Sequence, residues 1–121
     1  MIERFEQLDV WQKAHAVALK VYGTTPTMPS DQKYGLRSQM QRAAVSVPAN
    51  IAEGFKRRGR LDKIRSYNIA QGSLEELRYY FILCRDLGYK IEYDSLAGQA
   101  DEVSRMLHGL IDSVERFRKS S

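Results

Sequence analysis

The residues best suited to chemistry in this sequence are basic side chains gathered near its middle. Within ten positions the chain carries six lysines and arginines: Lys56, Arg57, Arg58, Arg60, Lys63 and Arg65. Asp62 is the only acid among them. Such side chains bind the phosphates of a nucleic-acid backbone and leave base identity largely unread. We therefore take this run, extended by Arg37 and Arg42, as the candidate nucleic-acid contact.

The distribution of charge agrees with this choice. Residues 34–65 carry eight basic and two acidic side chains, whereas residues 66–121 carry a net charge of −2. A local excess of charge attracts an anionic partner more than the modest total of +4 does. Two alternatives stay open. Lysine and arginine favour the C-terminal ends of helices, and the same surface would suit an acidic protein.

Other reactive side chains are too scattered to indicate catalysis. His15 and His108 lie far apart in the sequence, and neither has a second ligand three or four positions away. Cys84 falls among apolar residues, where a free cysteine behaves as a small hydrophobe. No glycine-rich phosphate loop follows a strand. The sequence therefore predicts no enzyme, no catalytic residue, no metal site, no cofactor and no small-molecule substrate.

Length and composition predict a single domain over residues 1–121. No apolar run reaches the roughly 18 residues that a membrane span needs. The N-terminal residues include acids and lack an apolar core, so they do not resemble a secretory signal. With one cysteine and no signal, the expected location is the cytoplasm.

A long second helix is expected to position the basic run. Apolar residues recur every three or four positions across residues 40–51, which is the spacing of one helix face. We predict a helix over about residues 34–58, kinked at Pro48, because proline lacks a backbone donor and crowds the preceding turn. Asn50 is expected to hydrogen-bond a backbone group that the kink frees.

Three further helices are expected on the same grounds. The first should begin after Asp9, whose side chain would cap it, and end at about Gly23. The third should cover about residues 62–87, and the fourth should be capped by Asp94 or Ser95. A seam of apolar residues at alternating steps of four and three marks the fourth helix: Leu96, Ala100, Val103, Leu107, Leu110, Val114 and Phe117. Short links predict an all-α, up-down-up-down antiparallel four-helix bundle.

Several acids precede a basic residue by four positions, which is the spacing of a favourable ion pair within a helix. These pairs are Glu53/Arg57, Asp101/Arg105, Asp112/Arg116 and Glu115/Lys119. Small residues of the second helix, Gly54 among them, are expected to let neighbouring helices approach closely. In the third helix, close packing at Gly72-Ser73 is expected to offset the low helix propensity of glycine.

The second half of the third helix is apolar on more than one side, across residues 77–87. A bundle that stays a monomer buries one stripe per helix, so additional apolar sides predict contact with another protein. We predict a homo-oligomer whose interface includes Tyr79, Tyr80 and Leu83.

Four segments of the chain carry a family resemblance. They are LDVWQKAHAVALKVY, MPSDQKYGLRSQMQRAAVSVPANIAEG, IAQGSLEELRYY and ADEVSRMLHGLI. Together they span nearly the whole chain, and they resemble the small four-helix bundle protein family encoded in intervening sequences of large-subunit ribosomal RNA genes. The chain departs from the family at Gln41-Arg42, where two basic residues are frequent.

The resemblance implies a ring-like homopentamer, because similar proteins assemble in this way. It also implies contact with nucleic acid, because similar proteins accompany retroelement reverse transcriptases as accessory variability proteins. Two functions follow as hypotheses. The first is a non-enzymatic oligomeric bundle that binds RNA or a ribonucleoprotein through its basic surface. The second is a homo-oligomeric scaffold or protein-interaction module that binds no nucleic acid.

Overall fold

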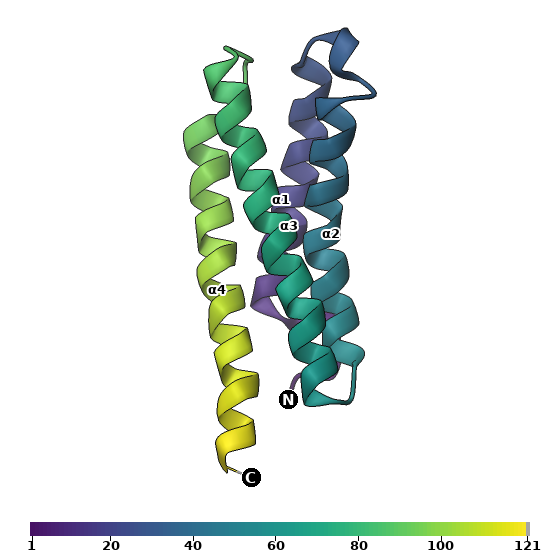
Figure 1. Ribbon diagram of the computed structural model, residues 1–121, viewed down its shortest axis with the longest axis vertical. Helices are drawn as coiled ribbons and strands as arrows, with labels where there is room; N and C mark the ends of the chain where they lie inside the picture. Colours follow the sequence, from purple (N-terminus) through teal and green to yellow (C-terminus); the bar gives the residue numbers. More distant parts are fainter. Residues whose placement is uncertain (121) are drawn as a thin grey trace.

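The computed structural model describes the backbone of residues 1–120 and the side chains of residues 1–116. Four helices run along one long axis (Figure 1): α1 (Asp9–Thr24), α2 (Leu36–Lys56), α3 (Arg60–Asp86) and α4 (Tyr93–Ser120). Three short 3-10 helices precede or follow α1: η1 (Phe5–Gln7), η2 (Thr25–Thr27) and η3 (Ser30–Gln32). Residues 1–120 contain no strand, so the prediction of an all-α bundle of four helices is confirmed.

Consecutive helices run in opposite directions and pack side by side. Each helix contacts the next one along the chain, and α4 returns to contact α1. Both chain ends and the α2–α3 link therefore lie at one end of the bundle (Figure 1). The other two links meet at the opposite end, where Thr27 Oγ1 donates a hydrogen bond to the Lys90 carbonyl at 3.2 Å.

The core is made from the apolar stripes that the sequence predicts. The buried residues of the α4 seam are Leu96, Ala100, Val103 and Leu107, and those of α1 include Val10, Ala14, Val17 and Val21. Further along α4, Leu110 and Val114 are half-buried. Phe117 belongs to the predicted seam but lies outside the described side chains. The 3.6-residue helical period brings each stripe onto the face that meets the other three helices.

The start of α1 differs from the prediction. Asp9 is the first helical residue, and Leu8 precedes it without a side-chain cap. The Gln12 backbone N–H bonds the Leu8 carbonyl at 3.1 Å, and Gln12 Nε2 donates to the Glu6 carbonyl at 2.8 Å. The predicted Asp9 cap is therefore wrong, because the η1 turn supplies the start of the helix. The observed bounds of α2 and α3 otherwise lie close to those expected.

The helix α2 continues through Pro48, which is buried in the core. A bend at this residue stays a prediction. Asn50 Nδ2 donates to the Ser46 carbonyl at 2.8 Å and lies 3.1 Å from Ser46 Oγ. Asn50 therefore takes a structural role, although its acceptor is not the Ala44 carbonyl, which is the group that loses its donor at Pro48.

The helices α2 and α3 approach closely at Gly54 rather than at Gly72. A methyl group added to Gly54 would lie 2.6 Å from Cε1 of the Tyr67 ring and 3.1 Å from Ser66 Cβ. The same group added to Gly72 would meet nothing within 4 Å. The expected close packing at Gly72-Ser73 is therefore wrong for Gly72, whereas Ser73 does meet α2, because its Oγ lies 2.8 Å from Ser46 Oγ. The expected close approach at Gly54 is confirmed.

The acids of α4 do not pair as their spacing suggests. Asp101 lies 2.9 Å from Arg78 of α3, and Asp112 lies 3.4 Å from His108. The predicted pairs of Asp101 and Asp112 with the basic residues four positions onward are wrong. Asp101 finds its partner on the neighbouring helix α3, which the spacing along one helix cannot reveal, whereas Asp112 meets a residue four positions before it in α4.

Candidate nucleic-acid interface

The six cations of the predicted run gather where α2 turns into α3. The helix α2 ends at Lys56, residues 57–59 make the link, and α3 begins at Arg60. The Arg57 N–H bonds the Glu53 carbonyl at 3.1 Å, and the Lys63 N–H bonds the Gly59 carbonyl at 3.0 Å, so hydrogen bonds close both sides of the link. We call the set Lys56, Arg57, Arg58, Arg60, Lys63 and Arg65 the basic turn.

Lys63 holds this turn together. Its Nζ donates to the carbonyls of Gly54 at 3.1 Å and Phe55 at 2.7 Å, which belong to the last turn of α2. Carbonyls at a helix C-terminus lack partners within the helix, so a lysine there satisfies them and complements the helix dipole. Burial lowers the pKa of Lys63. The ammonium group of Lys63 is therefore engaged by these two carbonyls within the chain.

Three arginines of the basic turn form ion pairs. Arg57 pairs with Glu53, as the sequence predicts, and Arg65 pairs with Asp62 at 3.5 Å. Arg60 reaches across to α4 and lies 3.4 Å from Glu115. The predicted partner of Glu115 was Lys119, which lies outside the described side chains. Exposed pairs of this kind contribute only about 0–1 kcal/mol, so a phosphate can replace a carboxylate at low cost.

Lys56 and Arg58 are the remaining cations of the basic turn. Both side chains are exposed. No ion pair among residues 1–116 includes either of them. A phosphate can therefore bind Lys56 or Arg58 without first displacing a carboxylate from either side chain.

Arg37 and Arg42 do not join the basic turn. Both lie on α2, and Arg37 is its second residue. At 1.5 Å per helical residue, Arg37 lies about 30 Å from Arg57 along the axis, and Arg42 lies about 20 Å from Lys56. The eight predicted contacts thus divide into six at one end of the bundle and two that lie toward the other end.

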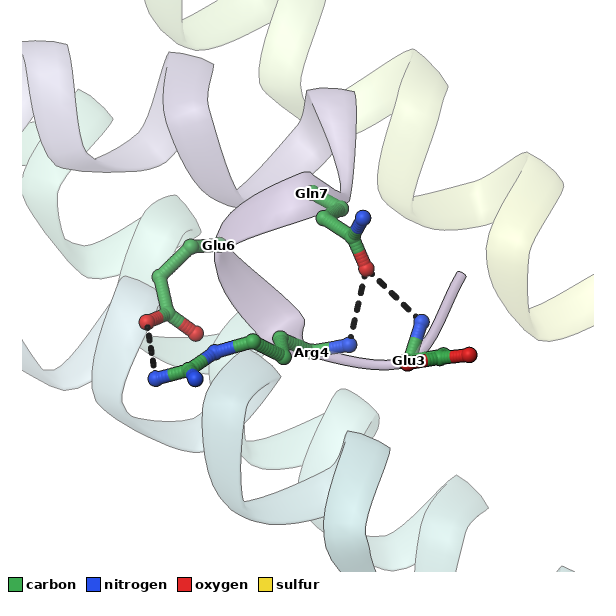
Figure 2. A network of polar contacts seen from close by, with 4 residues as sticks. All are labelled: Glu3, Arg4, Glu6 and Gln7. Atoms are coloured by element: carbon green, nitrogen blue, oxygen red, sulfur yellow. Dashed lines mark hydrogen bonds and ion pairs between the residues drawn. The ribbon is translucent and has the colours of Figure 1, made fainter. Parts of the chain in front are cut away.

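The N-terminal segment adds a cation that the sequence did not reveal. Figure 2 shows Gln7 Oε1 accepting from the backbone N–H groups of Glu3 at 2.7 Å and Arg4 at 3.0 Å, while Arg4 lies 3.3 Å from Glu6. This fold of the segment places Arg4 with Lys56 in the lining of a hollow of about 530 Å³, and this lining also includes Glu3, Glu6 and Glu53. Nothing in the balanced charge of residues 1–33 could have indicated this position.

The predicted oligomer residues differ in their surroundings. Tyr79 is 57% exposed, whereas Tyr80 and Leu83 are half-buried. The Tyr80 hydroxyl lies 2.6 Å from Glu76 Oε1 and 3.0 Å from Gln39 Oε1, so it links α3 to α2. The hydrogen bond to Glu76, together with burial, raises the pKa of Tyr80 to about 12.

A groove runs beside Tyr79 between α3 and α4. Its volume is about 220 Å³, and its apolar lining includes Tyr79, Ile82, Tyr93 and Ala97. Arg78 crosses its polar side, where it pairs with Glu75 at 2.6 Å and Asp101 at 2.9 Å. Ile82 is 38% exposed and was absent from the predicted interface. It lies three positions after Tyr79, a spacing that puts both side chains on one face of α3, so helical periodicity within the apolar stretch 77–87 could have indicated it.

The histidines and the cysteine have structural surroundings. The His15 ring stacks on Trp11, with centroids 5.0 Å apart. Cys84 is buried against Met40, with 3.7 Å between the sulfur atoms, and burial raises the pKa of the thiol. Within the described side chains, no three His, Cys, Asp or Glu residues gather in a way that could hold a metal ion.

None of the described helices has the length and apolar character that crossing a membrane requires.

Comparison with known proteins places this geometry in a family. Residues 6–109 match the sequence profile of the family described as 23S rRNA-intervening sequence protein. No protein with a curated description matches the chain. The solved structures that it resembles include a protein of unknown function from the S23 ribosomal protein family of Bacteroides thetaiotaomicron. The sequences are 25% identical, the TM-score is 0.78, and the match covers 85% of this chain and 95% of that one.

Proposed function

This chain belongs to the 23S rRNA-intervening sequence protein family, and from that premise we propose that it is a non-enzymatic bundle that binds RNA through its basic turn. The observation that carries the proposal is the gathering of six cations at one end of the bundle, two of them without an acidic partner among the described residues. The family description refers to 23S rRNA, so RNA is the first polyanion to test.

The chemistry of the basic turn suits a phosphate backbone. Lys56 and Arg58 can each take a phosphate directly. Arg57 and Arg65 are held only by exposed acids three or four positions away, with 51% and 76% of the two arginine side chains exposed. Contacts of this kind position a strand and supply affinity without reading bases. We therefore expect binding with little sequence preference.

The salt dependence of binding tests this proposal. Each phosphate neutralised on a single strand contributes about −0.7 to the slope of log affinity against log salt. Lys56 and Arg58 alone would give a slope of about −1.4, and Arg57 and Arg65 would extend it to about −2.8. Fluorescence polarisation of a labelled single-stranded RNA, titrated at several salt concentrations, measures this slope. No binding at 50 mM salt would contradict the proposal.

A second proposal concerns assembly, and the exposed apolar face of α3 favours it. Tyr79 and Ile82 stand beside the groove between α3 and α4. Contiguous apolar surface of this kind marks contact with another protein. We propose a homo-oligomer that buries this face, with five subunits as the number that the family resemblance implies. Such an assembly could serve as a scaffold without RNA, or it could present several basic turns to one strand and raise affinity by avidity.

Replacing Tyr79 by Asp should dissociate this assembly into single subunits, because a carboxylate would be buried without a partner at the interface. Light scattering after size exclusion, at micromolar concentration, measures the mass. Tyr34→Asp is the matched control, since Tyr34 is 88% exposed in the α1–α2 link and does not line the groove. A single-subunit mass for the unchanged protein would refute the proposal, as would an unchanged mass for Tyr79→Asp.

A further inference from the structure

The three ion pairs of the basic turn are not equivalent. Arg57–Glu53 joins the residue that follows α2 to one in its last turn, and Arg65–Asp62 joins two residues of α3, so both pairs are local in sequence. Arg60–Glu115 joins α3 to α4 across 55 positions of sequence. The Arg60 side chain is 25% exposed, less than either of the other two arginines. Arg60 is therefore the one arginine of the basic turn that is partly buried by a contact with another helix, α4.

The contact between Arg60 and Glu115 leaves most of the guanidinium unused. It consists of one approach, Nη1 to Oε2 at 3.4 Å. A tight charge-assisted pair has a shorter distance and frequently two parallel hydrogen bonds. Carboxylate and phosphate oxygens suit the same planar donors of arginine. Glu115 thus occupies Arg60 as a phosphate would, but weakly enough to be displaced.

We propose that Glu115 is an internal competitor of RNA phosphate for Arg60. The inference rests on the proposed RNA binding by the basic turn. In the free protein Arg60 is turned toward α4, so RNA first meets Lys56 and Arg58. RNA gains the contact with Arg60 only by displacing Glu115. The Glu115 carboxylate therefore lowers the affinity for RNA. It also makes the slope of log affinity against log salt shallower by the contribution of one cation.

The neighbouring charges do not take over this role. Lys63 is directed to the carbonyls at the end of α2. Asp112, one helical turn before Glu115, lies beside His108. Arg116 is exposed, and no ion pair among residues 1–116 includes it. Removing the charge of Glu115 therefore frees Arg60 and no other described cation.

Glu115→Gln tests the proposal because it keeps the size of the side chain and removes its charge. We expect affinity for a labelled single-stranded RNA to rise about two- to fivefold at 0.1 M salt, with a slope of log affinity against log salt steeper by about 0.7. The matched control is Glu102→Gln, which makes the same change on α4 at a carboxylate that lies 3.5 Å from Lys13. Glu102 is about 20 Å from Glu115 along the helix, beyond the screening length of about 10 Å at 0.1 M salt. Its change should leave affinity nearly unaltered.

Arg60→Gln, made alone and together with Glu115→Gln, completes the test as a double-mutant cycle. Alone it should change RNA affinity little, because Arg60 is already occupied. In the Glu115→Gln background it should abolish both the gain in affinity and the steeper slope. A gain that survives the loss of Arg60 would reflect net charge and would overturn the proposal.

The outcomes also separate this proposal from the one on which it rests. If the unchanged protein binds RNA and Glu115→Gln behaves like Glu102→Gln, RNA binding stands and the competitor is refuted. If neither the unchanged protein nor Glu115→Gln binds at 50 mM salt, both proposals are refuted. Circular dichroism of each variant checks that helix content is unchanged, so that any difference in affinity reflects Arg60 and not a loss of fold.

Discussion

The Lys56→Glu/Arg58→Glu double variant is expected to lose measurable RNA binding at 100 mM salt while keeping its helical spectrum. Both side chains are exposed and belong to no described ion pair, so their reversal breaks no ion pair within residues 1–116. It replaces two phosphate-binding cations by two acids that repel the strand. Fluorescence polarisation with labelled RNA measures the loss.

A control with the same change of charge shows whether position matters. Lys33 and Lys90 lie at the opposite end of the bundle, in the α1–α2 and α3–α4 links. The Lys33→Glu/Lys90→Glu variant should retain most of the affinity. Equal losses in the two variants would indicate attraction by net charge alone. Undiminished binding by Lys56→Glu/Arg58→Glu would remove the basic turn as the contact and leave the scaffold as the better hypothesis.

Gly54→Val should be the most destabilising of the substitutions considered for this bundle. A first carbon atom would already lie 2.6 Å from the Tyr67 ring, and that ring is only 2% exposed, so it has little room to move. Overpacking of a core typically costs about 1–3 kcal/mol, and the branched side chain of valine adds to the clash. The variant should therefore lose about 3 kcal/mol of unfolding free energy, a large share of the roughly 5–15 kcal/mol of a typical domain. Denaturation with urea, followed by circular dichroism, measures this loss.

Glycine-to-alanine changes separate the clash from helix propensity. Alanine in place of an unhindered helical glycine should stabilise by about 1 kcal/mol. Gly109 of α4 has no atom within 4 Å of an added methyl group, so Gly109→Ala should show this gain. Gly54→Ala should instead destabilise, because the contact with Tyr67 outweighs the gain in propensity. A gain at both positions would show that α2 and α3 can separate without cost.

Features that depend on neighbours within one or two helical turns were predictable from the sequence. The spacing of Val10, Ala14, Val17 and Val21 predicted a buried stripe, and all four residues are buried in α1. Glu53 and Arg57 are four positions apart, and they pair because the helix itself brings them together. Lys56 through Arg65 are close in sequence, so any tight turn between α2 and α3 gathers them at one end.

Features that depend on how the helices face one another were not predictable in this way. Close approach was expected at both Gly54 and Gly72 because both are helical glycines, but only Gly54 admits a neighbouring side chain, the Tyr67 ring, while Gly72 meets nothing. The sequence placed Arg37 with the basic turn by charge alone, whereas the length of α2 separates them by about 30 Å.

Ion pairs show most clearly the difference between features set by local sequence and features set by the packing of the helices. The sequence alone determined four amphipathic helices, their order and the local excess of positive charge. Only the tertiary structure decided that Arg60 pairs with Glu115, 55 positions away, and that Asp101 pairs with Arg78. Helical periodicity specifies which residues share a face of one helix. It does not specify how far each helix is rotated against its neighbours, and that rotation, set by the packing of all four buried stripes, chooses the partners of side chains at the helix edges.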